Sequence, residues 1–207
     1  YGLMISNDLG IKNSFVSTDS NKIMKIGKRY NFEIINRPKI LCQKDSLTED
    51  VLIHAYEYMK SKCDFDIVLL LFANNPAISI NLVKKGINFL KKNKSYDSAF
   101  SVSKYNMFSP IRARKILNDQ IKPFVPLKQF KNINSIRSSQ GDVYFCDLSV
   151  QIIRKKVFEN MDKGMQPFQW MGKKSYPLFN TYGFDIDEKW QKIAIEEWLR
   201  ENWHKKR

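Results

Sequence analysis

The 207-residue sequence has little of what several common functional sites need. It contains two histidines, His54 and His204, so a histidine-rich zinc site or a Ser-His-Asp triad has little to draw on. Its three cysteines, Cys42, Cys63 and Cys146, form no Cys-x-x-Cys pair. An odd number of unclustered cysteines favours a reducing compartment, and we therefore expect a cytoplasmic location.

Long hydrophobic runs are also missing. The longest covers residues 67–73, well short of the roughly 20 residues that a transmembrane helix needs. The first ten residues show no basic region followed by an apolar stretch, so we expect neither a signal peptide nor a membrane partner. Hydrophobic residues make up 43% of the chain, which is enough for a packed core. We expect one domain over residues 1–207.

Basic residues outnumber acidic residues, and the formal net charge is +14. Such a charge has two interpretations: an anionic partner such as nucleic acid or nucleotide phosphate, or lysines spread over solvent-facing helix surfaces. The lysines are distributed along the whole chain and far exceed the arginines, whereas a nucleic-acid groove favours clustered arginine. We favour the second interpretation and do not expect nucleic acid as a partner.

The first half of the chain alternates between two hydrophobic periodicities. Short apolar runs bounded by turn residues predict strands, and apolar residues spaced by three and four predict helices. The alternation predicts an α/β domain with a mostly parallel sheet, in which ligands bind at the carboxyl ends of the strands. The predicted strands are 15–18, 32–35, 67–72 and 97–102, and the predicted helices are 20–30, a helix capped by Ser46 or Thr48 that runs to about residue 59, and 80–90.

The second half is less regular. Residues 104–141 hold three prolines and weak periodicity, which predicts an irregular arm. We expect a strand at 143–146, a helix at 149–161, an irregular aromatic stretch at 163–177, a short strand ending at 185–187 and a helix at 188–203.

Two carboxylates stand out in the predicted strand end, Asp185 and Asp187. On an extended backbone, residues two apart point the same way, so the two carboxylates would converge. Such a pair suits Mg²⁺, which typically takes one or two carboxylates together with phosphate oxygens and water. The alternative is that Asp187 caps the last helix and Asp185 interacts with its positive end.

Other polar residues follow predicted strands. Arg37 could hold a phosphate or be an ordinary surface arginine. Asn74 and Asn75 could bind sugar hydroxyls or simply form a turn, and residues Gln140 to Tyr144 could line a sugar pocket or form a hairpin turn. Each signal is weak alone.

The order of these pieces is more informative than any single one, and it resembles the acylneuraminate cytidylyltransferases, the CMP-sialic acid synthetases and their relatives. The resemblance extends over nearly the whole chain. The pieces that carry it are Val16-Ser-Thr-Asp19, Arg37-Pro38, Asp45-Ser46, Asn74-Asn-Pro76, Ser98-Ala-Phe-Ser-Val102, Gly141-Asp-Val-Tyr144 and Asp185-Ile-Asp187.

The resemblance implies a Rossmann-like nucleotide-diphospho-sugar transferase fold, three-layer α/β/α, in an enzyme that transfers CMP from CTP to an acidic keto-sugar and releases pyrophosphate. It implies that residues 104–141 are a dimerisation arm, so that the protein is a homodimer. It also implies roles for single residues: Mg²⁺ on Asp185 and Asp187, nucleotide contacts from Arg37, Ser46 and Thr48, and sugar contacts from Gln140 and Tyr144, next to Asn74 and Asn75.

The chain also departs from the family pattern. The family begins with a strand and a Gly-rich loop that grips the triphosphate; residues 2–11 resemble the helix after that loop, so we expect the first strand to be missing and this chain alone to be inactive. Phe72 and Ile78 stand where the family has Gln and Arg, and Gly141-Asp142 replaces Asn-Gly-Ala. Two alternatives stay open: another sugar nucleotidyltransferase, and a non-catalytic nucleotide- or RNA-binding protein.

Overall fold

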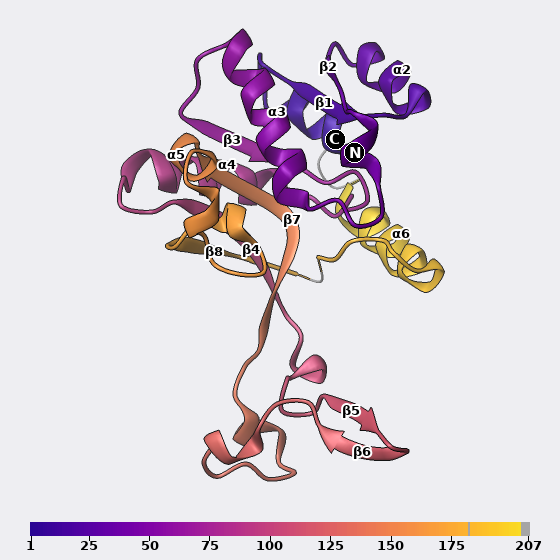
Figure 1. The fold of residues 1–207 in the computed structure, drawn as a ribbon, viewed down its shortest axis with the longest axis vertical. Coiled ribbons are helices and arrows are strands. Elements are labelled where there is room, and N and C mark those ends of the chain that lie inside the picture. The colour runs from indigo at the N-terminus through magenta and orange to yellow at the C-terminus, as the bar shows by residue number, and fades with distance from the viewer. Residues whose placement is uncertain (182, 204–207) are drawn as a thin grey trace.

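The computed structural model describes residues 1–181 and 183–203; Tyr182 and residues 204–207, which include His204, lie outside the described part. Figure 1 shows a layered body and an arm that extends away from it along the longest axis of the molecule. The arm carries the β5–β6 hairpin at its far end. The predicted arm at residues 104–141 is therefore present as a projecting structure.

Six α-helices and eight strands form within the described residues. The helices are α1 (Gly2–Asp8), α2 (Asn21–Arg29), α3 (Thr48–Lys62), α4 (Ile80–Lys92), α5 (Lys155–Phe158) and α6 (Lys189–Trp203). The strands are β1 (Phe15–Thr18), β2 (Glu33–Asn36), β3 (Ile67–Leu70), β4 (Ser98–Lys104), β5 (Arg114–Leu117), β6 (Gln120–Pro123), β7 (Tyr144–Arg154) and β8 (Ser175–Asn180).

The strands of the body form two sheets. β1 and β2 pair in parallel, and the other four strands have the order β3-β7-β4-β8. β7 is antiparallel to β3 and β4, whereas β4 and β8 are parallel, so β3, β4 and β8 run in one direction and β7 runs against them. The mostly parallel sheet that we predicted is thus interrupted by β7. Its direction follows from the arm, because the chain leaves the body along β4 and returns beside it as in a hairpin.

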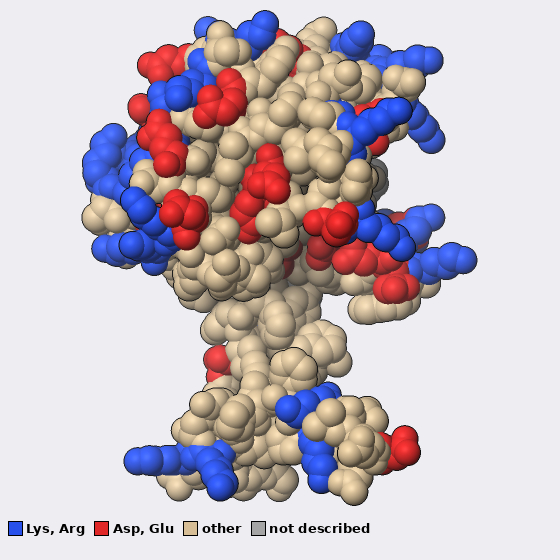
Figure 2. All heavy atoms as spheres, in the orientation of Figure 1, with Lys and Arg blue, Asp and Glu red and all other residues tan. Residues whose placement is uncertain are grey.

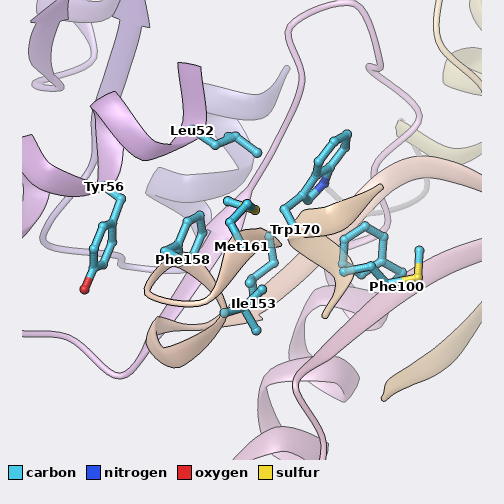
Figure 3. Close-up of a cluster of buried hydrophobic side chains, with 9 residues drawn as sticks. Leu52, Tyr56, Phe100, Ile153, Phe158, Met161 and Trp170 are labelled. Carbon is cyan, nitrogen blue, oxygen red and sulfur yellow. The ribbon is translucent and has the colours of Figure 1, made fainter. Parts of the chain in front are cut away.

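Two hydrophobic layers cover opposite faces of the four-stranded sheet. Neighbouring residues of β7 point to opposite faces, as a strand requires: Ile153 packs with Leu52 and Tyr56 of α3, and Ile152 packs with Val83 of α4. Figure 3 shows the α3 layer, in which Phe100, Phe158, Met161 and Trp170 complete the cluster. Burying each large side chain contributes roughly 1.5–3 kcal/mol. The three-layer α/β/α architecture is therefore confirmed.

Helix starts follow the predicted capping chemistry in part. Ser20 Oγ accepts a hydrogen bond from Ile23 N at the start of α2, as expected of an N-cap. The prediction that Ser46 or Thr48 caps the third helix is wrong. Leu47 occupies the cap position of α3, and the Ser46 hydroxyl is used in the preceding loop, where it donates to Ile40 O.

Three predictions in the second half of the chain are also wrong. Residues 149–154 of the predicted helix are strand and α5 covers only Lys155–Phe158, because Val150, Ile152 and Ile153 are buried and an apolar run of this kind fits a covered strand as well as a helix. β8 falls partly within a stretch that we expected to be irregular; Pro177 is tolerated there because β8 is an edge strand. Residues 185–187 lie in a non-regular segment rather than a strand.

A large bulge interrupts the pairing of β7 with β4. Phe100 is opposite Gln151 and Val102 is opposite Cys146, so that residues 147–150 of β7 face Ser101 alone. Leu148 within the bulge has a φ of 55°, a backbone conformation that residues other than glycine rarely adopt. Bulges re-aim side chains and are frequent beside functional sites. This one turns Asp147 and Ser149 into the interior, where both are buried.

Charge is spread over the body and scarce at its junction with the arm. Figure 2 shows Lys and Arg around the outline of the body, with Asp and Glu between them, and a junction almost without charged residues on this face. None of the helices in residues 1–181 and 183–203 combines the length and apolar character needed to cross a bilayer. The three cysteines are free thiols.

Candidate functional site

The carboxyl ends of β1 and β2 meet at one edge because the two strands are parallel and in register, with Thr18 opposite Asn36. Arg37 follows directly and is partly buried. Its guanidinium donates to Ser17 O (Nη2, 2.9 Å) and to Ser17 Oγ (Nε, 3.3 Å), and its backbone N–H donates to Thr18 O over 3.1 Å. Two strand ends are thus joined through one arginine, which fixes a positive charge at this edge.

An acidic side chain and a thiol lie beside Arg37. Partial burial and the neighbouring Asp19 carboxylate raise the pKa of the Cys42 thiol, and the Arg37 charge acts in the opposite direction. The Cys42 thiol also contacts Pro38 O at 3.3 Å. The loop after β2 therefore folds back toward the end of β1 and brings Asp19 and Arg37 into the same neighbourhood.

Ser46 and Thr48 belong to the end of this loop and the start of α3. Ser46 Oγ donates to Ile40 O over 2.9 Å and accepts from Gln43 N over 3.0 Å, and both Ser46 and Thr48 are partly buried. The hydroxyl of Ser46 is therefore engaged in shaping the loop that follows Arg37.

The second group of predicted residues meets at the carboxyl end of β3. Asn74 is exposed in the loop after β3, and its Nδ2 donates to Asp187 Oδ1 over 3.3 Å. Its carbonyl accepts from Ile186 N over 2.8 Å. The segment that carries Asp185 and Asp187 is therefore held against the Asn74 loop by two hydrogen bonds, one at Ile186 N and one at the Asp187 carboxylate.

The hydrogen bonds at the start of α6 concern the alternative role of Asp187 as the cap of this helix. The backbone N–H groups of Asp187 and Glu188 donate to Gln191 Oε1, so Gln191 reaches back and satisfies donors of the first turn. The Asp187 carboxylate meanwhile accepts from Asn74. The side chain of Asp187 is thus turned toward the strand ends.

The donor set at this point consists of oxygen atoms. The part of the chain that the structure describes has no cluster of three or more His, Cys, Asp or Glu side chains suited to a metal. Asp185 is partly exposed, Asp187 is exposed, and the Asn74 amide lies beside the Asp187 carboxylate. Carboxylate and amide oxygens of this kind fit Mg²⁺, which needs few protein ligands when substrate phosphate and water complete its shell, and do not fit zinc.

Gln140 and Tyr144 contact residues outside this group. Gln140 lies on the arm, where its Oε1 accepts from Arg112 Nε over 2.7 Å. Tyr144 opens β7 at the junction of arm and body, opposite Lys104, with its ring 5.4 Å from that of Phe179. Tyr144 therefore lies on the arm side of the bulge.

Asn75 has a different environment from the one we predicted. It is 1% exposed; its Nδ2 donates to Asp147 O over 2.6 Å, and its Oδ1 accepts from Ser149 Oγ over 3.0 Å. Both ends of the amide are occupied within the protein, so a direct sugar contact is not supported. We reassign Asn75 as a residue that supports the loop bearing Asn74.

Sequence reasoning missed the partner of Asn75. Asp147 is buried beneath this loop. It lies two residues before the helix that we expected to begin at residue 149. The available signal was the β-branched run Val150, Ile152 and Ile153, which favours a strand and would have placed Asp147 at its bulged section.

No family model matches the sequence, and none of the curated proteins matches it. Solved structures do resemble it. A CMP:2-keto-3-deoxy-manno-octonic acid synthetase complexed with CTP aligns with 97% of this chain and 87% of its own, with a TM-score of 0.62 and 12% identity. A putative glucose-1-phosphate thymidylyltransferase from Bacillus anthracis aligns with 95% of this chain and 78% of its own, with a TM-score of 0.52 and 12% identity.

A glucosyl-3-phosphoglycerate synthase from Mycobacterium tuberculosis aligns with 86% of this chain and 62% of its own, with a TM-score of 0.50 and 8% identity. Identities this low establish similarity of fold. Together with the layers and strand order described above, they identify the architecture as the Rossmann-like fold of the nucleotide-diphospho-sugar transferases.

Proposed function

We propose that the protein is a nucleotidyltransferase that transfers CMP from CTP to the anomeric hydroxyl of a nonulosonic, sialic-acid-like sugar and releases pyrophosphate. The observation that carries the proposal is the contact between Asn74 and Asp187 at the carboxyl ends of the strands, where α/β folds bind ligands. The fold shared with a synthetase complexed with CTP supports the choice of nucleotide.

The proposed reaction is an in-line attack by the sugar hydroxyl on the α-phosphorus of CTP. Such a step depends on positioning and on neutralising charge rather than on a covalent enzyme intermediate. Arg37 is fixed by two hydrogen bonds to Ser17 and would hold the nucleotide at the end of β1, with Ser46 and Thr48 shaping the loop beside it. Asn74, exposed at the end of β3, would orient the sugar.

Asp185 and Asp187 would hold Mg²⁺, which when bound supplies a positive charge that polarises the phosphoryl oxygens. Their own contribution is to provide two hard oxygen donors on a segment anchored by Ile186 N to Asn74 O. The same anchor keeps the carboxylates next to the residue proposed to orient the sugar.

We further propose that the arm mediates a homodimer. Ile116 and Ile121 are opposite each other in the β5–β6 hairpin, and both are at least two thirds exposed. An isolated two-stranded hairpin is marginally stable in water, so an apolar face of this kind favours burial against a partner. Gln140 and Tyr144, on the arm side of the bulge, would then contribute to a sugar pocket only through this dimer.

The experiment that tests the function is a pyrophosphate-release assay on the folded protein. CTP and UTP are each combined with Mg²⁺ and a panel of eight- and nine-carbon keto-sugar acids. Release with CTP and one acid supports the proposal and identifies the sugar. If the folded protein releases pyrophosphate with none of the pairs, the proposal fails.

A matched pair of variants tests the metal residues in the same assay. Asp187→Asn is expected to lower turnover by roughly 10²–10³-fold, the loss typical of removing one charge-stabilising group. Asp119→Asn serves as the control, because Asp119 lies in the turn of the arm hairpin at a φ of 60°, a conformation that Asn tolerates. Equal turnover in both variants would contradict the proposed role of Asp187.

A further inference from the structure

A buried carboxylate outside the proposed catalytic group is fully engaged in hydrogen bonds. Asp147 is 4% exposed. Its Oδ1 accepts from Ser101 Oγ and, over 3.0 Å, from Ser149 N; its Oδ2 accepts from Ser103 Oγ over 2.5 Å and from Asn180 Nδ2 over 3.1 Å. Burying a carboxylate is costly unless donors surround it, and here four groups from β4, β7 and β8 do so.

The network extends to the loop that carries Asn74. The carbonyl of Asp147 accepts from Asn75 Nδ2, and Ser149, whose N–H donates to the Asp147 carboxylate, also donates its hydroxyl to Asn75 Oδ1. Both ends of the Asn75 amide are thus fixed by the bulge. Because Asn74 precedes Asn75 directly, its position depends on the same bonds.

The network also extends to the segment that carries Asp185 and Asp187. Gly183 N donates to Ser103 Oγ over 3.0 Å, and Ser103 donates to Asp147. A Cβ at Gly183 would lie 2.7 Å from Asp147 Cγ and 2.5 Å from Ser149 Oγ. The segment therefore passes directly over the buried carboxylate, at a distance that only glycine permits.

We propose that Asp147 is a positioning residue: its carboxylate sets the place of the Asn74 loop and of residues 183–187 relative to each other. The two parts meet again at Ile186 N and Asn74 O, so the bulge, the loop and the segment form a closed ring of contacts. The inference rests on the proposed function insofar as Asn74, Asp185 and Asp187 are the groups being positioned.

Two serines on β4 provide a matched test. Ser101 and Ser103 are both fully buried and both donate to Asp147. Ser101 accepts from Val150 N within the sheet, whereas Ser103 accepts from Gly183 N of the proposed site segment. Ser103→Ala removes the hydrogen-bonded link between that segment and Asp147, and Ser101→Ala removes a comparable hydroxyl while leaving the link in place.

The first readout is amide hydrogen exchange at Ile186, measured by NMR on the full protein. We expect Ser103→Ala to speed exchange at Ile186 by about tenfold or more and Ser101→Ala to leave it near the wild-type rate. Equal rates in the two variants would overturn the proposal. If Ser103→Ala does not fold, Gly183→Ala replaces it in the comparison with Ser101→Ala. The change at Gly183 disturbs the contact from the segment itself, because the added Cβ meets the Asp147 carboxyl group.

The second readout is Mn²⁺ binding followed by electron paramagnetic resonance, with Mn²⁺ as the probe for the Asp185–Asp187 pair. Ser103→Ala is expected to weaken binding by about tenfold more than Ser101→Ala; equal affinities would contradict the positioning role. If the wild-type protein binds no Mn²⁺, the metal assignment of the proposed function fails. The exchange rates at Ile186 then still decide whether Asp147 positions the segment.

Discussion

Asn74 Nδ2 and Asp187 Oδ1 lie 3.3 Å apart although 113 positions separate them in the chain. The contact joins the loop after β3 to the segment before α6, and it exists because the carboxyl ends of β3, β4 and β8 lie at one edge of the sheet. The proposed chemistry depends on this pair.

Removing the Asn74 side chain should impair the reaction more than the fold. Because Asn74 is exposed, we expect Asn74→Ala to change the free energy of unfolding by less than about 1 kcal/mol. Loss of its contact with Asp187 should lower kcat/KM by roughly tenfold or more. Steady-state kinetics and urea denaturation check this. Asn88→Ala, an exposed position on α4, is the control, and equal kinetics in both variants would refute the role.

Arg37 should not be replaceable by lysine. Its Nε and Nη2 both bond to Ser17, a two-point geometry that an ammonium group cannot reproduce. We expect Arg37→Lys to raise the KM for CTP by about tenfold, nearly as much as Arg37→Ala. The control is Arg29→Lys at the exposed end of α2. A normal KM in Arg37→Lys would show that charge alone is sufficient.

Arg154 should be a large contributor to stability. It is 7% exposed, and its guanidinium donates to the carbonyls of Leu90, Asn93 and Tyr96, which satisfies groups at the end of α4. We expect Arg154→Met, which removes these three buried, charge-assisted hydrogen bonds, to lower the free energy of unfolding by about 3 kcal/mol. A loss below about 1 kcal/mol would mean that water replaces the guanidinium.

Asp97 should make stability dependent on acid pH. Burial by itself raises the pKa of Asp97, but the Lys156 ammonium at 2.6 Å and the N–H groups of Lys173 and Lys174 outweigh it and lower the pKa below its ordinary value. A lowered pKa in the folded state means that the contribution is complete above the unfolded pKa, about 4, and is lost as the pH falls through the folded pKa.

We therefore expect wild type and Asp97→Asn to differ by a constant free energy of unfolding between pH 6 and 8, and the difference to shrink below about pH 4. Urea denaturation at a series of pH values measures both curves. A difference that stays constant down to pH 2 would contradict the lowered pKa.

The arm hairpin should decide the oligomeric state. Ile121→Glu places a charge on the apolar face that Ile121 shares with Ile116, and it should convert a dimer to a monomer. Lys122→Glu, opposite Lys115 on the other face of the hairpin, is the control and should leave the dimer intact. Sedimentation velocity distinguishes the two. A wild-type monomer at all concentrations would refute the dimer itself.

The elements that the sequence predicted well are those whose periodicity is enforced by one packing surface. α4 repeats its apolar residues at helical spacing because one face packs on the sheet, and β1 and β3 are short apolar runs between turn residues. The start of β7 matches the strand predicted at 143–146. Its continuation to Arg154 was missed because both faces are covered there, so Val150, Ile152 and Ile153 leave no alternation to read.

The site was predictable only at the level of strand ends. The rule that ligands bind at the carboxyl ends of parallel strands drew attention to Arg37 after β2 and to Asn74 after β3, and the structure brings Asn74 together with Asp187. Nothing in the spacing indicated that Asn75 turns inward, because its burial depends on Asp147, 72 positions later and within a bulge. Pairings formed by tertiary contact leave no local pattern in the sequence.

The bulge at residues 147–150 has a consequence for how this protein can vary. β4 and β7 pair on both sides of the bulge. Phe100 is opposite Gln151 on the body side, and Val102 is opposite Cys146 on the arm side. A change in length or twist on the arm side is absorbed by the four unpaired residues and does not shift the ladder in the body. Residues of the arm beyond Lys104 can therefore accept insertions or deletions while the layers around Ile152 and Ile153 keep their packing.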